Sequence, residues 1–232
     1  MSSPVPSPVP AAGNGVAART REQLLRGACE LIRREGHVPT ISDVAEVAGV
    51  SRATAYRYFR SRSKLIAAVV DFSLGPVRRF ASVLPQADAR LEELFRTTFT
   101  RFKEFEPQMR SALQLSLEHG ALAASGRLEE EAYRRGYRVA ILRRTFAPLR
   151  ATMSAGAVER LCKAVSVVYG IEPYVVLKDI WGCSDEEVGE IAYWTASALL
   201  RQAVADAARA RPSAAQAAKS PAPKARRGAR TT

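Results

Sequence analysis

Two arginines, two tyrosines and two hydroxyl residues lie close together in the segment GVSRATAYRYF, residues 49–59. In a helix that begins after Ser51, side chains three and four residues apart share a face. Ala55 and Phe59 are four apart and form an apolar face with Val50, which leaves both arginines on the other side. Burying two arginines without acidic partners is costly. The segment therefore predicts a helix whose outer face contacts solvent or an anionic partner.

The side chains on this outer face are of the kinds that bind double-stranded DNA. Arg52 lies in the first turn, the part of a reading helix that enters the major groove most deeply, and arginine donates two hydrogen bonds to guanine. Ala53 and Thr54 are short enough for close approach, and their methyl groups suit thymine. Tyr56 and Arg57 carry polar groups on longer arms, which suit phosphate oxygens. We therefore predict a DNA-reading helix.

The predicted contact surface extends beyond this helix. Helices beginning at Thr40 and Ser61 offer backbone N–H groups to phosphates, and Arg62 and Lys64 extend the basic rim. Tyr58 is ambiguous, because it could contact phosphate or cover the core. The predicted DNA-binding residues are Thr40, Ser51, Arg52, Ala53, Thr54, Tyr56, Arg57, Tyr58, Arg62 and Lys64.

Two further helices must position the reading helix. Thr40 and Asp43 have the spacing of a capping box at the start of a short helix that ends at Gly49. A short helix, a glycine-containing turn and a second helix form a helix-turn-helix. An amphipathic helix over about residues 20–35 supplies the third wall of its core.

The remainder of the chain is also predicted to be helical. Apolar residues recur at helical spacing, and the alternation typical of strands is absent. Pro107 should end one helix and Pro173 should interrupt another. The predicted fold class is all-α, with a three-helix helix-turn-helix DNA-binding domain followed by a larger helical bundle. Beyond the reading helix we expect helices at 61–74, 90–105, 108–122, 128–149, 155–181 and 184–208.

Charge is distributed unevenly along the 232 residues, whose net charge is +12. Residues 19–70 hold ten basic and five acidic side chains, residues 71–207 hold 18 of each, and residues 208–232 hold seven basic and no acidic ones. The net positive charge toward both ends of the chain suggests a polyanionic partner. The basic tail could add non-specific DNA affinity, or serve only for solubility.

These patterns divide the chain into four predicted parts. They are a disordered leader (1–18), a helix-turn-helix DNA-binding domain (19–66), a larger helical domain (67–209), to which the family resemblance described below assigns ligand binding and dimerisation, and a disordered basic tail (210–232). The leader holds four prolines and no charge, so it does not have the form of a secretory signal. No apolar run is long enough to span a membrane. We expect a cytoplasmic, nucleoid-associated protein.

The chain lacks the sequence patterns of catalytic and metal-binding sites. His37 and His119 are the only histidines, and the three cysteines match no zinc pattern. No nucleophile motif or phosphate-binding glycine loop occurs. The chain is therefore expected to be no enzyme and to use no cofactor or metal. His119 is expected at a surface helix end.

The segment TISDVAEVAGVSRATAYRYFRSRSKLIAAVV, residues 40–70, resembles the helix-turn-helix of the tetracycline-repressor (TetR) family of bacterial transcriptional regulators. One departure is Arg62, which stands where the family usually has lysine. The resemblance implies a homodimer that binds operator DNA and is released from it by a small molecule, of unknown identity, held in the larger helical domain. It also implies dimerisation through the last two long helices.

Residues 155–208 fit such a dimer seam, although two apolar helices could also form internal core. Aromatic residues and methionine in the middle of the chain could line the ligand pocket or simply fill the core. The candidates are Phe95, Phe99, Phe102, Met109, Leu113, Tyr133, Tyr137 and Tyr169. The predicted function is a ligand-responsive regulator, either repressor or activator, with repression favoured. The alternative is a nucleoid-type protein that binds DNA non-specifically through its tail.

Overall fold

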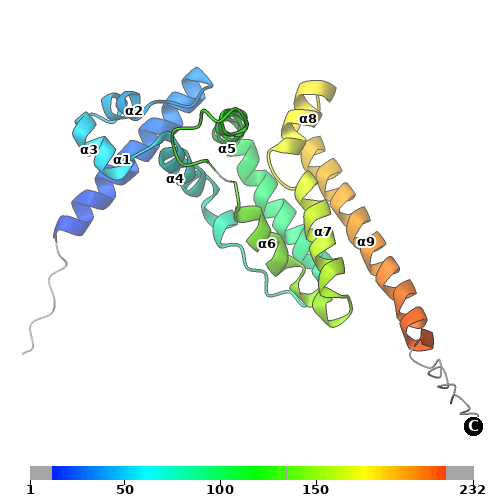
Figure 1. The fold of residues 1–232 in the computed structure, drawn as a ribbon. Coiled ribbons are helices and arrows are strands. Elements are labelled where there is room, and N and C mark those ends of the chain that lie inside the picture. The colour runs from blue at the N-terminus through cyan, green and yellow to red at the C-terminus, as the bar shows by residue number, and fades with distance from the viewer. Residues whose placement is uncertain (1–11, 134, 218–232) are drawn as a thin grey trace, which may run out of the picture.

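The computed structural model describes residues 12–133 and 135–217, and every regular element within them is a helix (Figure 1). The prediction of an all-α fold, with a helix-turn-helix domain followed by a larger helical domain, is confirmed. No helix in the described ranges is long and apolar enough to cross a membrane. The elements are α1 (Ala12–Glu35), α2 (Ile41–Val47), α3 (Arg52–Tyr58), α4 (Arg62–Leu74), η1 (Gly75–Arg79), α5 (Ala87–Ala124), α6 (Tyr137–Thr145), η2 (Ala147–Ala151), α7 (Ala155–Val168), α8 (Glu172–Trp181) and α9 (Asp185–Ala217).

Helices α1, α2 and α3 form one end of the molecule (Figure 1). The predicted capping box is present at α2, where Asp43 N–H donates to Thr40 Oγ1 at 3.2 Å and Thr40 N–H donates to Asp43 Oδ2 at 3.1 Å. At α3 the Ser51 hydroxyl accepts from Thr54 N–H at 3.2 Å. Between the two helices Gly49 has φ 64°, a left-handed conformation that glycine adopts without steric cost. Local sequence thus fixes the turn that orients α3.

Helix α4 belongs to both parts of the fold. Its Leu65, Ile66 and Val69 are buried in the core formed with α1, α2 and α3. Its Leu74 packs against the larger core of the helical domain, and Val70 contacts both cores. The predicted boundary after residue 66 therefore falls inside a helix whose two ends are buried in different cores.

Helix α5 crosses the middle of the molecule as two helical segments that meet at a kink. Phe105 has non-helical backbone angles (φ −121°, ψ 25°), so the break predicted at Pro107 is present, but as a kink and not as a connection between separate helices. Proline removes one backbone hydrogen bond and pushes against the preceding turn, which bends a helix without necessarily ending it. Buried side chains on both sides of the kink, including Phe102 and Met109, keep the two halves on one core.

The predicted helix over 128–149 is largely wrong. Only Tyr137–Thr145 forms an α-helix, followed by the short η2, and the connection from α5 to α6 is irregular. Residues with high helix propensity occupy this connection, but they form hydrogen bonds and ion pairs with other elements and do not form a helix. Tertiary contacts override propensity here.

The ends of the chain are more helical than predicted. Helix α1 begins at Ala12, so residues 12–18 of the predicted leader are helical, and α9 continues to Ala217, past the predicted boundary at residue 209. The disorder predicted for residues 1–11 and 218–232 lies outside the described residues.

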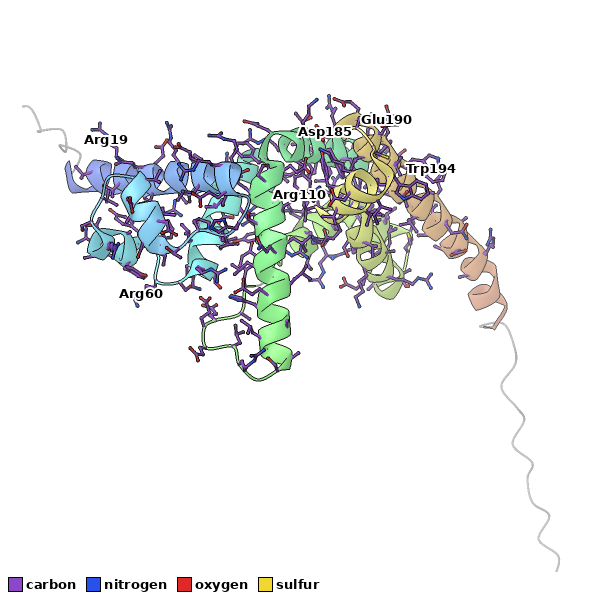
Figure 2. All side chains as sticks on the ribbon, turned by 90° about the horizontal axis from the view of Figure 1, so that it is seen from above. Arg19, Arg60, Arg110, Asp185, Glu190 and Trp194 are labelled. Atoms are coloured by element: carbon purple, nitrogen blue, oxygen red, sulfur yellow. The ribbon has the colours of Figure 1, made fainter. Side chains whose placement is uncertain are left out.

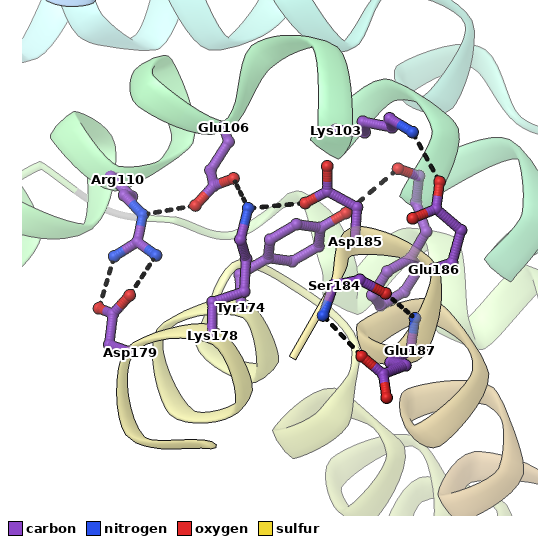
Figure 3. Close-up of polar contacts among 11 residues, drawn as sticks. Lys103, Glu106, Arg110, Tyr174, Lys178, Asp179, Ser184, Asp185, Glu186 and Glu187 are labelled. Carbon is purple, nitrogen blue, oxygen red and sulfur yellow. Dashed lines mark hydrogen bonds and ion pairs between the residues drawn. The ribbon is translucent and has the colours of Figure 1, made fainter. Parts of the chain in front are cut away.

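The last two elements, α8 and α9, are tied to the second half of α5 by ion pairs (Figure 3). Arg110 pairs with Glu106 at 2.8 Å and with both carboxylate oxygens of Asp179 at 2.7 Å. Lys178 Nζ lies 2.7 Å from Glu106 and 2.7 Å from Asp185. These partners come from all three helices, so the network fixes how α8 and α9 sit on α5.

Replacing Gly49 by alanine tests the geometry of the turn. A Cβ at this left-handed position should cost about 1–2 kcal/mol, which urea unfolding followed by circular dichroism will measure. Gly120→Ala is the matched control, because Gly120 lies inside α5 with open space around its Cα. There alanine should be neutral or stabilise by up to about 1 kcal/mol. Equal effects of the two substitutions would contradict the assigned turn.

Candidate nucleic-acid interface and internal cavity

The outer face of α3 is exposed in the structure. Ala55 and Phe59 are buried at 0% and 3% exposure, so the apolar face lies inward as predicted. Tyr56 is 47% exposed. The exposed residues of this face are Arg52, Ala53, Tyr56 and Arg57. Their contact with DNA stays a prediction, but the surface that it requires is present.

Thr54 and Tyr58 are less exposed than their neighbours on the outer face of α3. The Ser51 hydroxyl donates to Thr54 Oγ1 at 2.9 Å, so the hydrogen of the Thr54 hydroxyl is left to donate outward. Tyr58 is half-buried and packs against the core of α1–α4. The ambiguity over Tyr58 is thus resolved for its ring, which covers the core.

Arg62 and Lys64 are bound within the chain, contrary to the expectation that they form a free basic rim. Arg62 Nη1 and Nη2 each donate to a different oxygen of Glu118 at 3.0 Å. Lys64 Nζ lies 2.7 Å from Glu131. Hydrogen bonds from Arg62 hold the pKa of Glu118 below its usual value. A phosphate would have to displace Glu118 to reach Arg62 in this conformation.

A cavity of about 100 Å³ lies in the helical domain, between α4, η1, α5, α6 and the α7–α8 connection. The part of α4 that reaches it presents Ala67, Val70 and Leu74. The structure brings five of the eight predicted pocket residues together in its wall. They are Phe102, Met109, Tyr133, Tyr137 and Tyr169.

The other three predicted pocket residues lie elsewhere. Phe95 and Phe99 stack with ring centroids 5.4 Å apart and line a separate surface groove against α9. Leu113 is half-buried against the larger core, outside the lining of the cavity. Helical periodicity identified all three as inward-facing, but it does not distinguish a packed core from a cavity.

The cavity wall also contains three arginines that the sequence analysis missed: Arg78, Arg135 and Arg138. Arg135 and Arg138 each place Nη2 2.9 Å from Glu172 Oε1. They were not identifiable among 35 basic residues, because only the fold brings them together. Nearby, the hydroxyl groups of Thr98 and Tyr169 lie 2.9 Å apart, and burial raises the pKa of Tyr169 to about 12.

His119 is buried, which corrects its predicted place at the surface. Its side chain is 2% exposed, Nδ1 accepts from Tyr133 N–H at 3.0 Å, and Nε2 lies 3.2 Å from Glu130. The α5–α6 connection folds back over the end of α5 and covers the ring. His119 therefore anchors the connection that carries Tyr133 and Arg135 into the cavity wall.

Among the described residues, no group of three or more His, Cys, Asp or Glu side chains could hold a metal ion. Burial raises the pKa of Cys29 and of Cys162, which favours the protonated thiol over the reactive thiolate.

Comparisons with known proteins agree with the helix-turn-helix geometry. Residues 24–69 match the family model described as bacterial regulatory proteins, tetR family. The HTH-type transcriptional regulator BetI of Rhizobium meliloti (strain 1021) is 33% identical over 99 residues, which cover 40% of this chain and 48% of that protein. The chain therefore spans about half the length of this curated relative.

Solved structures extend the likeness to most of the chain at the level of the fold. A tetR-family transcriptional regulator from Mesorhizobium loti MAFF303099 matches with a TM-score of 0.52 and 17% identity, over 80% of this chain and 96% of that chain. Another from Streptomyces coelicolor matches with a TM-score of 0.54 and 18% identity, over 81% and 83%. The matched family model, the curated relative and the solved structures are all described as transcriptional or regulatory proteins.

His119→Leu tests the anchoring of the α5–α6 connection. Leucine fills much of the same space but cannot accept from Tyr133 N–H, and a buried unpaired donor costs about 1–3 kcal/mol. We expect faster amide hydrogen exchange in the α5–α6 connection. His37→Leu is the control, since the His37 side chain is 54% exposed. Unchanged exchange in His119→Leu would show that the histidine does not hold the connection.

Proposed function

We propose that this chain is a homodimeric, sequence-specific DNA-binding regulator of the tetR family, whose affinity for its operator responds to a small molecule. The match of residues 24–69 to the tetR family model and the likeness to BetI support this proposal. Repression, relieved when that molecule binds, is the favoured form. A protein with this partner acts at the nucleoid.

The observation that carries this proposal is the exposed polar face of α3. Arg52 and Arg57 extend from a helix whose opposite face is fixed by buried Ala55 and Phe59. The Ser51 cap and the turn at Gly49 fix where α3 begins and how it is oriented on α2. A rigid helix with exposed arginine and tyrosine side chains suits the major groove, where arginine identifies guanine.

Exposed apolar side chains on α8 and α9 support a dimer. Ile180 is 73% exposed, Trp181 75% and Trp194 67%. Figure 2 shows Trp194 at the end of the molecule opposite α1–α3. Large aromatic residues are enriched in protein interfaces, and a second copy of the chain would cover this face. Two copies can present two α3 helices to successive major grooves, about 34–36 Å apart.

Helix α4 supports a response to a ligand. Its N-terminal end follows α3 directly, and its C-terminal residues Val70 and Leu74 line the cavity. A helix of 13 residues is about 20 Å long and transmits displacement as a rigid rod. A ligand that binds one position of α4 better than another would therefore shift the spacing of the two α3 helices.

Arg52→Ala and Arg57→Ala separate base reading from phosphate binding. An operator is first selected from random DNA and the affinities are then measured by gel shift. Arg52→Ala should lose about 1–3 kcal/mol of discrimination at one base pair. Arg57→Ala should weaken binding to all DNA sequences alike. It should also lower the slope of log binding constant against log salt concentration by about one.

Arg150→Ala, an exposed arginine in η2, is the control for both variants and should change neither quantity. Unchanged selectivity in Arg52→Ala would exclude the assigned base contact. If wild-type protein binds operator and competitor DNA equally, the chain is a non-specific DNA binder instead.

Trp194→Lys tests the dimer. A charge at the centre of an apolar interface should give monomers where the wild type is dimeric, as measured by analytical ultracentrifugation, and should abolish the preference for palindromic DNA. Leu117→Lys is the matched control, because Leu117 is an equally exposed apolar residue (65%) on α5. A Trp194→Lys protein that remains a dimer would refute the proposed seam.

A further inference from the structure

We propose that the cavity binds a small organic carboxylate, with Arg78 as the residue that recognises its negative charge. This inference deepens the proposed function, on which it rests, by naming the chemical class of the effector. It depends on three features of the cavity: unpaired donors, an excess of positive charge, and an apolar wall.

The unpaired donors belong chiefly to Arg78. Its side chain is 9% exposed, and it lines the cavity from η1. Nη2 contacts the carboxylate of Asp71, and the guanidinium lies against the ring of Tyr137. Nε and Nη1 are buried and have no acceptor. Buried polar groups normally have hydrogen-bond partners, so a donor without one marks a place for a missing acceptor.

The charges around the cavity do not balance. Arg135 and Arg138 share the single carboxylate of Glu172, and Arg135 Nε is also buried without an acceptor. Arg78 is paired with Asp71, which is 46% exposed and therefore solvated. Three cations face two carboxylates. Burial lowers the pKa of Arg78, because a cation is disfavoured where water is excluded. One bound anion would remove this imbalance, whereas a cationic ligand would increase it.

The rest of the cavity wall is apolar, which favours a ligand whose part beyond the carboxylate is apolar. Phe102, Met109 and Ile141 lie in the lining together with small aliphatic residues from α4. The volume of about 100 Å³ is smaller than the roughly 150 Å³ cavity that holds benzene in another protein. Butyrate has six non-hydrogen atoms, as benzene does, and benzoate has nine. Both therefore fit if the α5–α6 connection moves slightly, and benzoate requires the larger movement.

Matched pairs of ligands test the charge requirement. Isothermal titration calorimetry at neutral pH compares butyrate with butyramide, and benzoate with benzamide, on the full chain. Each pair has nearly the same shape, but only the carboxylate is charged. Hydrogen bonds between charged groups are stronger than those to a neutral amide. We expect at least one carboxylate to bind about tenfold or more tightly than its amide.

Arg78→Met removes the guanidinium and keeps the length of the side chain. It should abolish the preference for carboxylate, and circular dichroism will verify that it folds. Arg78→Lys, which keeps the charge, should retain part of the preference and covers the case in which the methionine variant does not fold. Arg79→Met is the matched control, because Arg79 is the exposed neighbour in η1, and it should bind as the wild type does.

Three results would overturn the proposal: amides that bind as tightly as carboxylates, carboxylates that bind equally to Arg78→Met, or no binding of either carboxylate to the wild type. Operator binding is measured on the same preparations. A chain that selects an operator but fails these titrations refutes only the ligand class. A chain that binds carboxylate but selects no DNA refutes the proposed function instead.

Discussion

The packing of α4 against α5 is the contact on which the rest of the structure depends. Helix α4 is too apolar to stand alone, and it is buried on one side by α1 and on the other by α5. Ala112 and Leu115 of α5 complete the same core as Leu24 and Leu31 of α1. Helix α3, the proposed DNA-reading helix, is therefore positioned by a core that includes part of the helical domain. A movement between α4 and α5 would disturb the core on which α3 packs.

The α5–α6 connection reinforces this contact at several points. Its Glu131 accepts from Ser63 Oγ through the backbone carbonyl at 3.0 Å and pairs with Lys64 through the carboxylate. Its Tyr133 is anchored by His119, and its Arg135 reaches Glu172 at the start of α8. A single irregular segment thus touches the N-terminal end of α4 and the cavity wall. In the proposed mechanism, a ligand in the cavity and a phosphate at Arg62 or Lys64 would both act on contacts of this region.

The helix-turn-helix was predictable because its determinants are local. Thr40, Ser51 and Gly49 specify caps and a turn within a few residues, and the apolar stripe of α1 has a simple period. The α5–α6 connection was not predictable, because its conformation depends on partners far along the chain. His119 and Glu131 illustrate this: nothing near either residue in the sequence indicates burial or an ion pair.

Helical periodicity could identify the residues that line the cavity only in part. Periodicity shows which aromatic residues face inward, and five of the eight candidates do line the cavity. It cannot show which of them face empty space, so Phe95 and Phe99 were placed in the wall although they stack in the core. Nor can it show that arginines from η1 and α6 face the same space. Which side chains share the cavity depends on how the helices cross, and the sequence pattern of a single helix does not specify that crossing.

Three departures from local regularity lie at or near the cavity. Arg78 is buried with unpaired donors, Pro107 kinks the helix that forms one wall, and Gly170 has φ 154°. A Cβ at Gly170 would lie 2.7 Å from Arg138 Nη2 and would press against Glu172, so glycine is needed for this ion pair. The helix-turn-helix has a positive φ of its own at Gly49, which the turn before α3 requires. Because proteins retain unfavourable local features mainly where function requires them, their position supports the cavity as a functional site. A ligand that satisfied Arg78 would stabilise the folded chain by binding linkage, and it would do so at the C-terminal end of the helix that leads to α3.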